Sequence, residues 1–313
     1  MTEKTPSPLT IAVPFYRDSA HLRSAIGSIF SQPRSNWAVL LVDNSVTERE
    51  QRDAADLASS YEKDGLRYVR NDAHLDACGN FNRCIDLATT DLVAVVHGDD
   101  EVLPCYAQQL TELAERHPAA AVLFTAVTII DERSRPRFSF VDWIKRFLMP
   151  AGVGDIVLEG EPSLQSIVRG NWLNAGAVCY RKSVLGDLRW DSRYRMTADL
   201  DLWARIIISG RSIAGSRRPA AYAYRRHAGQ TTAELSASLY RFEEESLMLD
   251  LIASRAEERG WRAAAVTARS KSIVQLHLLF LAALDVLTGS LGRARKKFRL
   301  LFEIRKSSGL TVG

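Results

Sequence analysis

Short apolar runs rich in β-branched residues recur through the first half of the chain, with amphipathic stretches between them. Runs of this length are typical of strands, whereas apolar residues three and four apart are typical of helices. The pattern predicts strands at 10–15, 37–43, 66–70, 91–97 and 120–130, and helices at 18–29 (capped by Asp18), 47–61, 79–88 and 104–116. Strands joined by helical crossovers predict an α/β fold whose mostly parallel sheet is covered by helices on both faces.

This regular alternation ends in the second half of the chain. Two prolines and several glycines surround an amphipathic piece at 143–149, which indicates a long loop or flap over 131–160. Beyond residue 233 the pattern is helical with no strand signal. Before it, we expect a strand at 175–181, a helix at 199–209 and a strand at 221–225. The sequence therefore predicts a sheet domain over 1–232 and a C-terminal α-helical appendage over 233–313.

Composition and charge narrow the class of protein. Of the 313 residues, 46% are hydrophobic and 25% charged, as in soluble globular proteins and unlike disordered chains. The formal net charge of +4 is too small to indicate a nucleic-acid-binding protein. Four scattered cysteines indicate neither a disulfide framework nor a zinc site. With no secretory leader, and with polar residues interrupting 273–291, we expect a cytoplasmic chain without a membrane-spanning helix.

Acidic residues end two of the predicted strands, where a parallel sheet binds its ligands. Asp43 ends one strand, and on its own it is equally typical of a helix cap. His97, Asp99, Asp100 and Glu101 follow the other strand. So much negative charge on one turn is costly unless water solvates it or a cation neutralises it. Because neither GxxxxGK[ST] nor GxGxxG is present, the turn favours a diphosphate held through Mg²⁺ or Mn²⁺.

Six blocks of residues, in order and spacing, resemble the inverting family 2 glycosyltransferases, which have the GT-A fold. They are VPFYR (13–17), VDNS (42–45), NFNR (80–83), HGDDEVLP (97–104), DLDLW (199–203) and YRRH (224–227). The resemblance covers about 9–232 and is to the bacterial surface-polysaccharide type. It implies a Rossmann-like GT-A sheet, a nucleotide-diphosphate sugar donor, a saccharide or lipid-linked acceptor and a divalent cation, Mn²⁺ or Mg²⁺.

The resemblance also implies roles for individual residues. On the donor side these are Pro14 and Tyr16 around the nucleotide base, Asp43 accepting its imide N–H, and Asn80, Asn82 or Arg83 facing the donor. Asp99 matches the metal-binding acid, Asp100 lies beside it near the ribose and metal, and His227 approaches the metal or diphosphate. Arg225 and Arg226 beside His227 favour an anion. Asp199 matches the general base, and the acceptor candidates are Trp172, Asn174 and Trp203.

Four positions depart from the family pattern. His97 stands where many members have the first Asp of a DxD motif, although imidazole binds Mn²⁺. Asn44 replaces a frequent second Asp, Phe81 replaces an Arg, and Ala198 replaces a Glu before the base.

Helical geometry supports Asp199 independently of the resemblance. On a helix Asp199 shares one face with Trp203 and Ile206, whereas Asp201 points about 200° away and can pair with Arg205. Only one of the two acids can therefore enter the site, and we expect Asp199, with Trp203 packing against a sugar. The alternative is that Trp203 belongs to the core and Asp199 only caps the helix.

The C-terminal end is a basic amphipathic segment, with seven basic residues and one acidic residue between 293 and 306. Such a segment suits an anionic membrane surface, at the inner face of the cell membrane, or equally a solvated face. Two other functions also remain open. One is a glycosyltransferase-like scaffold without activity, and the other is a glycoside hydrolase with a carboxylate pair, which gives no reason for the acidic turn.

Overall fold

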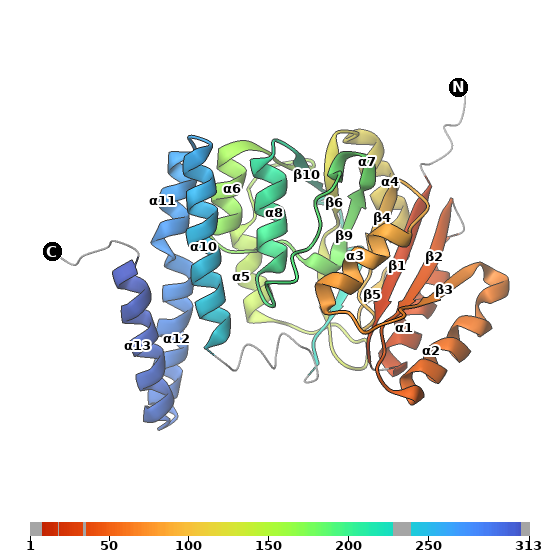
Figure 1. Cartoon of the computed structure of the whole chain (residues 1–313), viewed down its shortest axis with the longest axis horizontal. Coiled ribbons are helices and arrows are strands. Elements are labelled where there is room, and N and C mark those ends of the chain that lie inside the picture. Colours follow the sequence, from red (N-terminus) through yellow and green to blue (C-terminus); the bar gives the residue numbers. More distant parts are fainter. Residues whose placement is uncertain (1–7, 18, 34–35, 228–238, 308–313) are drawn as a thin grey trace.

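The computed structural model of the chain describes residues 8–17, 19–33, 36–227 and 239–307 (Figure 1). Asp18, the expected helix cap, and the expected domain boundary at 232/233 lie outside these residues.

Strands and helices alternate through the first half of the chain, as the apolar periodicity predicts. The elements up to the middle of the chain are β1 (Leu9–Phe15), α1 (Ser19–Phe30), β2 (Trp37–Asp43), α2 (Glu48–Ser60), β3 (Leu66–Arg70), α3 (Ala77–Leu87), β4 (Leu92–Val95), β5 (Glu101–Val102), α4 (Tyr106–Arg116), β6 (Ala120–Phe124), β7 (Val127–Ile130) and α5 (Phe140–Leu148). Those that follow are β8 (Ile156–Leu158), α6 (Gly160–Val168), β9 (Val178–Arg181), α7 (Lys182–Leu185), α8 (Ala198–Ile208), β10 (Ser212–Gly215), β11 (Tyr222–Arg225), α10 (Tyr240–Glu258), α11 (Arg262–Ser270), α12 (Ser272–Leu287) and α13 (Leu291–Ser307).

The main sheet has eight strands in the order β3-β2-β1-β4-β9-β6-β10-β8. Strands β1, β2, β3 and β4 pair in parallel, β6 pairs in parallel with β10, and β9 and β8 run antiparallel to their neighbours. This confirms a mostly parallel α/β sheet flanked by helices. The strand order reverses on either side of β1, and such a switch point is where open parallel sheets bind ligands.

A second sheet of three strands, β5-β11-β7, lies at the end of β4 and corrects the expected strand at 120–130. That stretch is two strands: β6 stays in the main sheet, and β7 leaves it to pair in parallel with β11. The expected strand at 175–181 begins only at Val178, after a 3₁₀ turn. The sequence pattern missed β5, β8 and β10, which have two to four residues each, too few to show a periodicity.

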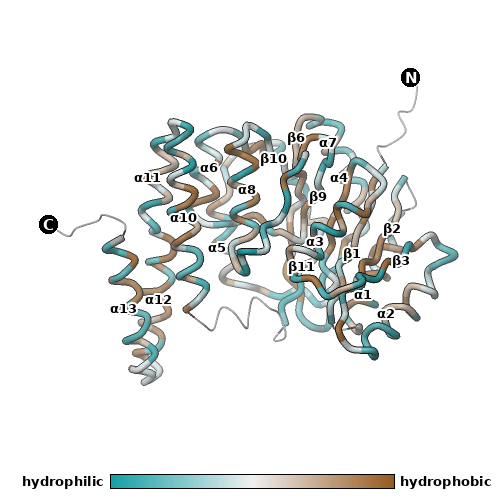
Figure 2. Tube along the Cα trace, in the orientation of Figure 1, coloured by the Kyte–Doolittle hydropathy of each residue, from teal (hydrophilic) through white to brown (hydrophobic). Residues whose placement is uncertain are grey.

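The core lies on both faces of the main sheet. Every residue of β1 is buried, and Ala12 faces one hydrophobic cluster while Ile11 and Val13 face the other. Figure 2 shows the hydrophobic positions along β1, whereas the outer helix α2, with its sequence EREQRDAADLASS, is largely hydrophilic. Alternating residues of one strand thus hold helices against both faces.

The C-terminal helices form a layer beside α6 and α8 (Figure 1). Phe242, Met248 and Ile252 of α10 belong to the same buried cluster as Leu164 of α6 and Trp203 of α8. The region expected to be a helical appendage is helical, and α10 shares its core with the sheet domain. By length and composition, one described stretch, Arg262–Leu287, is long and apolar enough to cross a membrane, although only 28% of its apolar window is buried.

Asp201 links α8 to α10 through a buried ion pair. Its carboxylate accepts hydrogen bonds from Arg205 Nε at 2.7 Å and from Arg255 Nη1 at 3.0 Å. The side chain of Asp201 is 1% exposed, whereas those of Arg205 and Arg255 are 21% and 27% exposed. The pairing with Arg205 confirms that Asp201 lies on the face of α8 away from Asp199.

We expect Asp201→Ala to lower the free energy of unfolding by about 3 kcal/mol, because two arginines lose the charge that compensates them. Urea unfolding followed by circular dichroism measures this. The control is Glu257→Ala, which removes the exposed partner of Arg269 and should change stability little. Equal stability of the two variants would show that the Asp201 pair does not hold α10 to α8.

Candidate active site

The turn after β4 approaches the end of β1 closely, at the switch point of the sheet. A Cβ built on Gly98 would lie 3.2 Å from the carbonyl oxygen of Pro14, so the backbones are nearly in contact. The loop after β2 joins them, because the amide of Asn44 donates to the carbonyl of Phe15 at 2.8 Å. Three strand ends therefore meet where the sequence placed its candidate residues.

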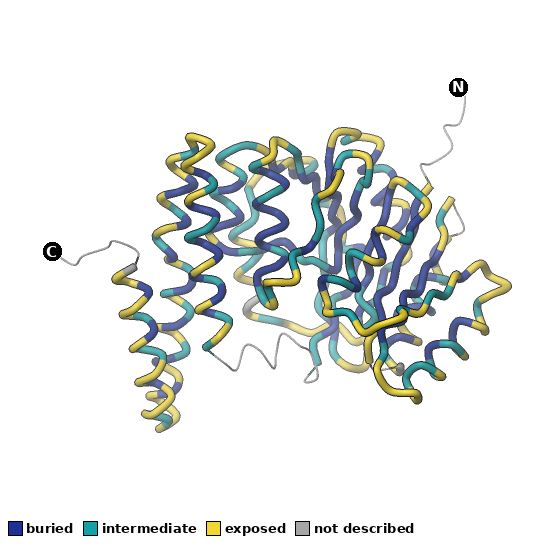
Figure 3. The backbone as a smooth tube through the Cα atoms, in the orientation of Figure 1, coloured by how far each residue is buried: buried dark blue, intermediate teal, exposed yellow. Residues whose placement is uncertain are grey.

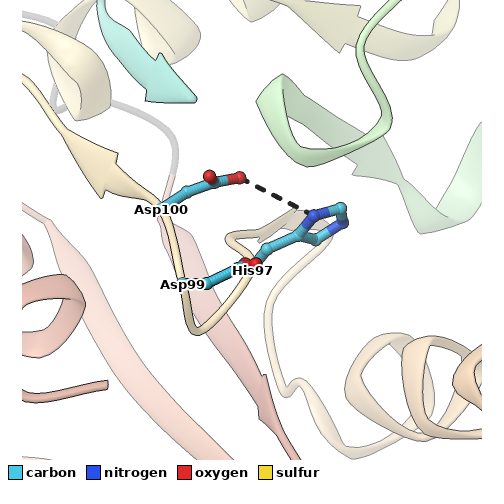
Figure 4. Close-up of side chains that lie close together, drawn as sticks. All are labelled: His97, Asp99 and Asp100. Atoms are coloured by element: carbon cyan, nitrogen blue, oxygen red, sulfur yellow. Dashed lines mark ion pairs between the residues drawn. The ribbon is translucent and has the colours of Figure 1, made fainter. Parts of the chain in front are cut away.

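His97, Asp99 and Asp100 gather on this turn (Figure 4). One ligand atom from each of the three lies within 4.8 Å of the others, and His97 Nδ1 is 3.7 Å from Asp100 Oδ2. Phe81 stacks on the His97 ring at 5.2 Å between centroids, with the ring planes almost parallel. Phe81 and His97, two of the positions that depart from the resembled pattern, thus pack on each other, and Phe81 orients the imidazole.

Asp99 meets His227, which follows β11. His227 Nε2 lies 3.1 Å from Asp99 Oδ2, and the Asp99 side chain is 32% exposed. Burial works to raise the pKa of Asp99, but the hydrogen bond to His227 and the nearby imidazoles of His97 and His227 outweigh it and lower that pKa. The structure thus places His227 against Asp99, beside the cluster that contains Asp100, and favours the ionised form of the Asp99 carboxylate.

Asp100 lies beneath the turn. Its side chain is fully buried, and its two oxygens accept hydrogen bonds from Tyr222 Oη at 2.6 Å and from the Arg225 amide at 2.8 Å. Burial, and after it the charge of Asp99, raises the pKa of Asp100 well above its usual value. Through these two hydrogen bonds Asp100 fixes the turn to β11. The expected contact of Asp100 with ribose or metal stays a prediction.

The two arginines before His227 do not form the anion site that the sequence suggested. Arg225 is 1% exposed, pairs with Glu101, and donates to the carbonyls of Asp99 and Asp131 at 2.7 and 2.9 Å. Arg226 pairs with Asp142 of α5 at 2.8 Å. Because each guanidinium already faces a carboxylate, their charges are compensated within the protein.

The cluster of His97, Asp99 and Asp100 fits a divalent cation that accepts nitrogen as well as oxygen ligands. Asp99 offers a partly exposed carboxylate, and His97 offers an imidazole nitrogen. A mixed oxygen and imidazole set suits Mn²⁺ better than Mg²⁺, which prefers oxygen ligands.

The nucleotide side of the site is organised around Asp43 and Asn44. Asp43 is fully buried and accepts from the Ser45 amide at 2.8 Å, from Ser45 Oγ at 2.6 Å and from Tyr68 Oη at 2.6 Å. Asn44 pairs in both directions with the backbone of Leu75, at 2.8 and 2.9 Å. Since three of the four acceptor directions of Asp43 are used, its expected contact with a base N–H stays a prediction.

Next to these residues the surface is hollowed, with a volume of about 180 Å³. Asn44, Ser45, Arg70, Asn71 and His74 are among the residues that line the hollow. Tyr16, 45% exposed, packs against the His74 ring at 5.3 Å. Tyr16 thus lies beside one residue of the hollow and Pro14 is buried in β1, and their expected place around a nucleotide base stays a prediction.

Of the α3 candidates, Asn80 is buried and accepts from Asn71 Nδ2 at 3.0 Å. Asn82 exchanges two hydrogen bonds of 2.9 Å with the backbone of Trp190, and Arg83 is exposed. Asn80 thus supports the loop that lines the hollow, Asn82 holds a distant segment, and no contact of Arg83 with the donor follows from its position.

Asp199 is half-buried at the start of α8. Its oxygens accept from Asn171 Nδ2 at 2.7 Å and from the Leu200 amide at 2.7 Å. Burial raises the pKa of Asp199, against these hydrogen bonds and the positive charge of Lys145, which lower it. A carboxylate with a raised pKa is a better proton acceptor, which suits the role expected of a general base.

Helix α5 occupies the expected flap and lies between the two halves of the site. Its Asp142 pairs with Arg226, next to His227, and the charge of Lys145 acts on both Asp142 and Asp199. The sequence reasoning missed Lys145 and Asn171, although the amphipathic piece at 143–149 pointed to this helix. Their signal lies in tertiary contacts, which spacing along the chain does not reveal.

The structure corrects two of the three acceptor candidates. Trp203 is 0% exposed and packs against Tyr180 and Trp190, and Trp172 is 5% exposed and packs against Phe124. Both tryptophans are core residues, because their large apolar rings gain most from burial there. Asn174 is half-buried and accepts from the Gly176 amide, so its expected role stays a prediction.

Glu244 of α10 holds the segment that precedes Asp199. Its Oε1 accepts from the Met196 and Thr197 amides at 2.7 and 2.8 Å, and Oε2 accepts from the Arg195 amide at 3.0 Å. Burial works to raise the pKa of Glu244, but these backbone donors and Tyr240 outweigh it and lower the pKa. A C-terminal helix thereby sets where α8 begins.

Comparison with known proteins agrees with this geometry. Residues 10–153 match the family model named Glycosyl transferase family 2. These residues are therefore similar to a family 2 glycosyltransferase domain. The match includes β1, the Asp43 loop and the His97–Asp99–Asp100 turn, and it ends before Asp199 and His227.

Named relatives and a solved structure extend the likeness beyond this domain. The chain is 26% identical over 206 residues to the putative glycosyltransferase EpsE of Bacillus subtilis, covering 64% of this chain and 67% of that protein. It is 25% identical over 202 residues to the amylovoran biosynthesis glycosyltransferase AmsB of Erwinia amylovora, covering 63% and 62%. The structure of S. aureus TarS 1-349 in complex with UDP-GlcNAc superposes with a TM-score of 0.59 at 15% identity, covering 96% of this chain and 90% of that one, which shows the fold.

We expect Asp99→Ala to abolish Mn²⁺-dependent binding of a nucleotide diphosphate, because the family domain loses the partly exposed carboxylate of its cation cluster. Titration calorimetry with and without Mn²⁺ measures this. Asp56→Ala removes an exposed acid from α2 and serves as the control. Unchanged Mn²⁺-dependent affinity in Asp99→Ala would contradict the assignment.

We expect Glu244→Gln to lower kcat about 10- to 100-fold while the affinity for the donor stays within about threefold of wild type. The glutamine keeps one acceptor oxygen, but its NH₂ group would face the backbone N–H groups that the carboxylate now accepts. This repulsion displaces the segment before Asp199, and small displacements are costly in catalysis. Steady-state kinetics gives the two constants, and Glu243→Gln, an exposed neighbour on α10, is the control. Loss of donor affinity with unchanged kcat would refute this positioning role.

Proposed function

We propose that the chain is an inverting glycosyltransferase, which moves a sugar from a nucleotide-diphosphate donor to an acceptor hydroxyl in polysaccharide, O-antigen or glycolipid biosynthesis. The single observation that carries the proposal is the contrast between the surroundings of two carboxylates, Asp99 and Asp199, which helix α5 links through Asp142 and Lys145. Asp99 is ionised beside two histidines, and Asp199 is a half-buried proton acceptor with a raised pKa. Donor activation and acceptor deprotonation need these two environments.

In the proposed reaction Asp199 takes the proton of the acceptor hydroxyl as that oxygen attacks the anomeric carbon. Asn171 and the Leu200 amide keep the carboxylate in one orientation while it accepts the proton. Because the attack comes from the face opposite the leaving diphosphate, a single displacement inverts the anomeric centre.

On the leaving-group side Asp99, His97 and His227 would hold the divalent cation. A bound cation would stabilise the charge that develops on the diphosphate. The protein itself contributes the ionised Asp99 and the rigid turn, which Asp100 and Arg225 fasten to the strands behind it.

The substrate classes rest on the relatives. EpsE and AmsB carry glycosyltransferase names, that of AmsB refers to amylovoran biosynthesis, and the TarS complex contains UDP-GlcNAc. We propose a nucleotide-sugar donor and a saccharide or lipid-linked saccharide acceptor for this chain, with the hollow beside Tyr16 and His74 as the place of the nucleotide. We further propose a cytoplasmic location, at the inner face of the cell membrane for a lipid-linked acceptor.

We expect Asp199→Asn to leave the Kd of the donor nearly unchanged and to lower turnover about 10²-fold or more, because the amide keeps the shape but accepts no proton. Wild-type turnover should fall as the pH drops through the raised pKa of Asp199, because the protonated carboxyl group cannot accept a proton. This decrease at low pH should be absent in the variant. Transfer assays over a pH series, with the donor Kd from calorimetry, measure both.

Asp187→Asn, which changes an exposed acid outside the site, is the matched control. Wild-type turnover in Asp199→Asn would refute the base assignment. Hydrolysis of glycosidic substrates without a nucleotide sugar would favour the hydrolase, and absence of Mn²⁺-dependent donor binding in the wild type would favour the scaffold.

A further inference from the structure

The outer face of α12 is apolar and exposed. Val274, Leu278 and Ala282 point inward and are buried, whereas the opposite face is exposed along the whole helix. Its exposed apolar residues are Leu276, Leu279, Phe280, Leu284, Val286 and Leu287. A helix that is apolar on both its buried and its exposed face indicates that the exposed face contacts a partner or a membrane.

Helix α13 turns back along α12 and concentrates the positive charge of the protein. It contains seven basic residues and one acidic residue, so the rest of the chain has two more acidic than basic residues. Ala294, Leu300 and Ile304 are buried, whereas Arg295, Lys296 and Arg299 are exposed. An apolar helix and a basic helix thus form one hairpin.

The turn between α12 and α13 combines exposed apolar residues with basic residues. Leu287 is 81% exposed before Gly289, and Leu291 is 66% exposed after it. Figure 3 shows that most of this turn is exposed, and Arg293, Arg295 and Lys296 follow within one and a half helical turns. Apolar side chains surrounded by cations suit the boundary between lipid headgroups and acyl chains.

The contacts of the α12–α13 hairpin favour binding to the surface of a bilayer over insertion across it. The apolar stretch Arg262–Leu287 is interrupted at Lys271, which has a left-handed backbone and a buried side chain 2.7 Å from Asp250. Ala264, Ala265 and Ala268 of α11 are buried too. Spanning a bilayer would expose this lysine to hydrocarbon and pull α11 out of the core.

We propose that the α12–α13 hairpin docks the protein on an anionic phospholipid bilayer, with Leu287 and Leu291 inserted at the headgroup boundary and Arg295 and Lys296 facing lipid phosphates. A second copy of the chain is the less suitable occupant, because a contact between two α12 faces would bring two strongly basic α13 helices together. Docking requires no donor or turnover, so it goes beyond the proposed transfer.

The orientation agrees with use of the site at a membrane. In Figure 1 β1 starts from the N-terminal trace at the top and runs downward, so the carboxyl ends of the parallel strands lie on the lower side. The hairpin turn also lies at the lower side. With a lipid-linked acceptor, as in the proposed function, docking brings the edge of the sheet that bears the proposed site toward the acceptor.

The test is co-sedimentation of the full chain with vesicles of equal parts phosphatidylglycerol and phosphatidylcholine, or of phosphatidylcholine alone. We expect binding to the anionic vesicles that weakens at about 0.5 M NaCl, where charges are screened beyond about 4 Å. Arg295→Gln with Lys296→Gln should weaken it about 25-fold, and Leu287→Gln with Leu291→Gln at least tenfold. The matched controls are Arg49→Gln with Lys63→Gln, and Val153→Gln with Val266→Gln, all exposed positions elsewhere.

The proposal would be overturned if both hairpin variants bound the anionic vesicles as tightly as the wild type does. It would also be overturned if the wild type bound vesicles of phosphatidylcholine alone as tightly as anionic vesicles. A wild-type dimer in sedimentation velocity that the Leu287/Leu291 variant dissociates, without an effect on vesicles, would show a contact between copies instead. Melting temperatures confirm that the variants are folded. Donor affinity measured in solution is independent of docking, so failure of this proposal and failure of the proposed transferase are distinguishable.

Discussion

The carboxylate of Glu244 is the constraint on which the Asp199 half of the proposed site depends. Backbone amides of a part-buried segment outside any helix or strand must find acceptors elsewhere in the protein. Here Glu244 of α10 accepts the amides of Arg195, Met196 and Thr197, and Asp201 pairs back to Arg255 of the same helix. Because two charged contacts fix α8 on α10, the position of Asp199 is decided by residues about fifty positions further along the chain.

Charge compensation explains the other half of the site. Arg225 and Arg226 face acids, and burial holds the pKa of Asp100 high, so Asp99 is the ionised acid of the proposed cation site. A divalent cation beside a single carboxylate and two imidazoles leaves excess positive charge, which a diphosphate offsets. The cluster is therefore expected to bind its cation much better when the donor is present, since each partner stabilises the other.

The sequence predicted the fold well where burial is two-sided and regular. The apolar runs before Phe15, Asp43 and His97 gave strands β1, β2 and β4, and with them the edge at which the site lies. It failed at Trp203, because an aromatic beside an acid on a helix looks the same whether it faces a sugar or the core. It also missed Glu244 and Lys145, since both act across contacts between elements that chain spacing does not encode.

Helix α5 joins the two halves electrostatically, which limits how independently they can change. Asp142 holds Arg226 next to His227, and Lys145 three residues later acts on Asp199. Removing the Lys145 charge from the neighbourhood of Asp199 leaves burial unopposed by that charge and raises the pKa of the base further. A displacement of α5 would therefore alter the surroundings of His227 and the pKa of Asp199 together, so the segment between β7 and β8 couples the two halves of the proposed site.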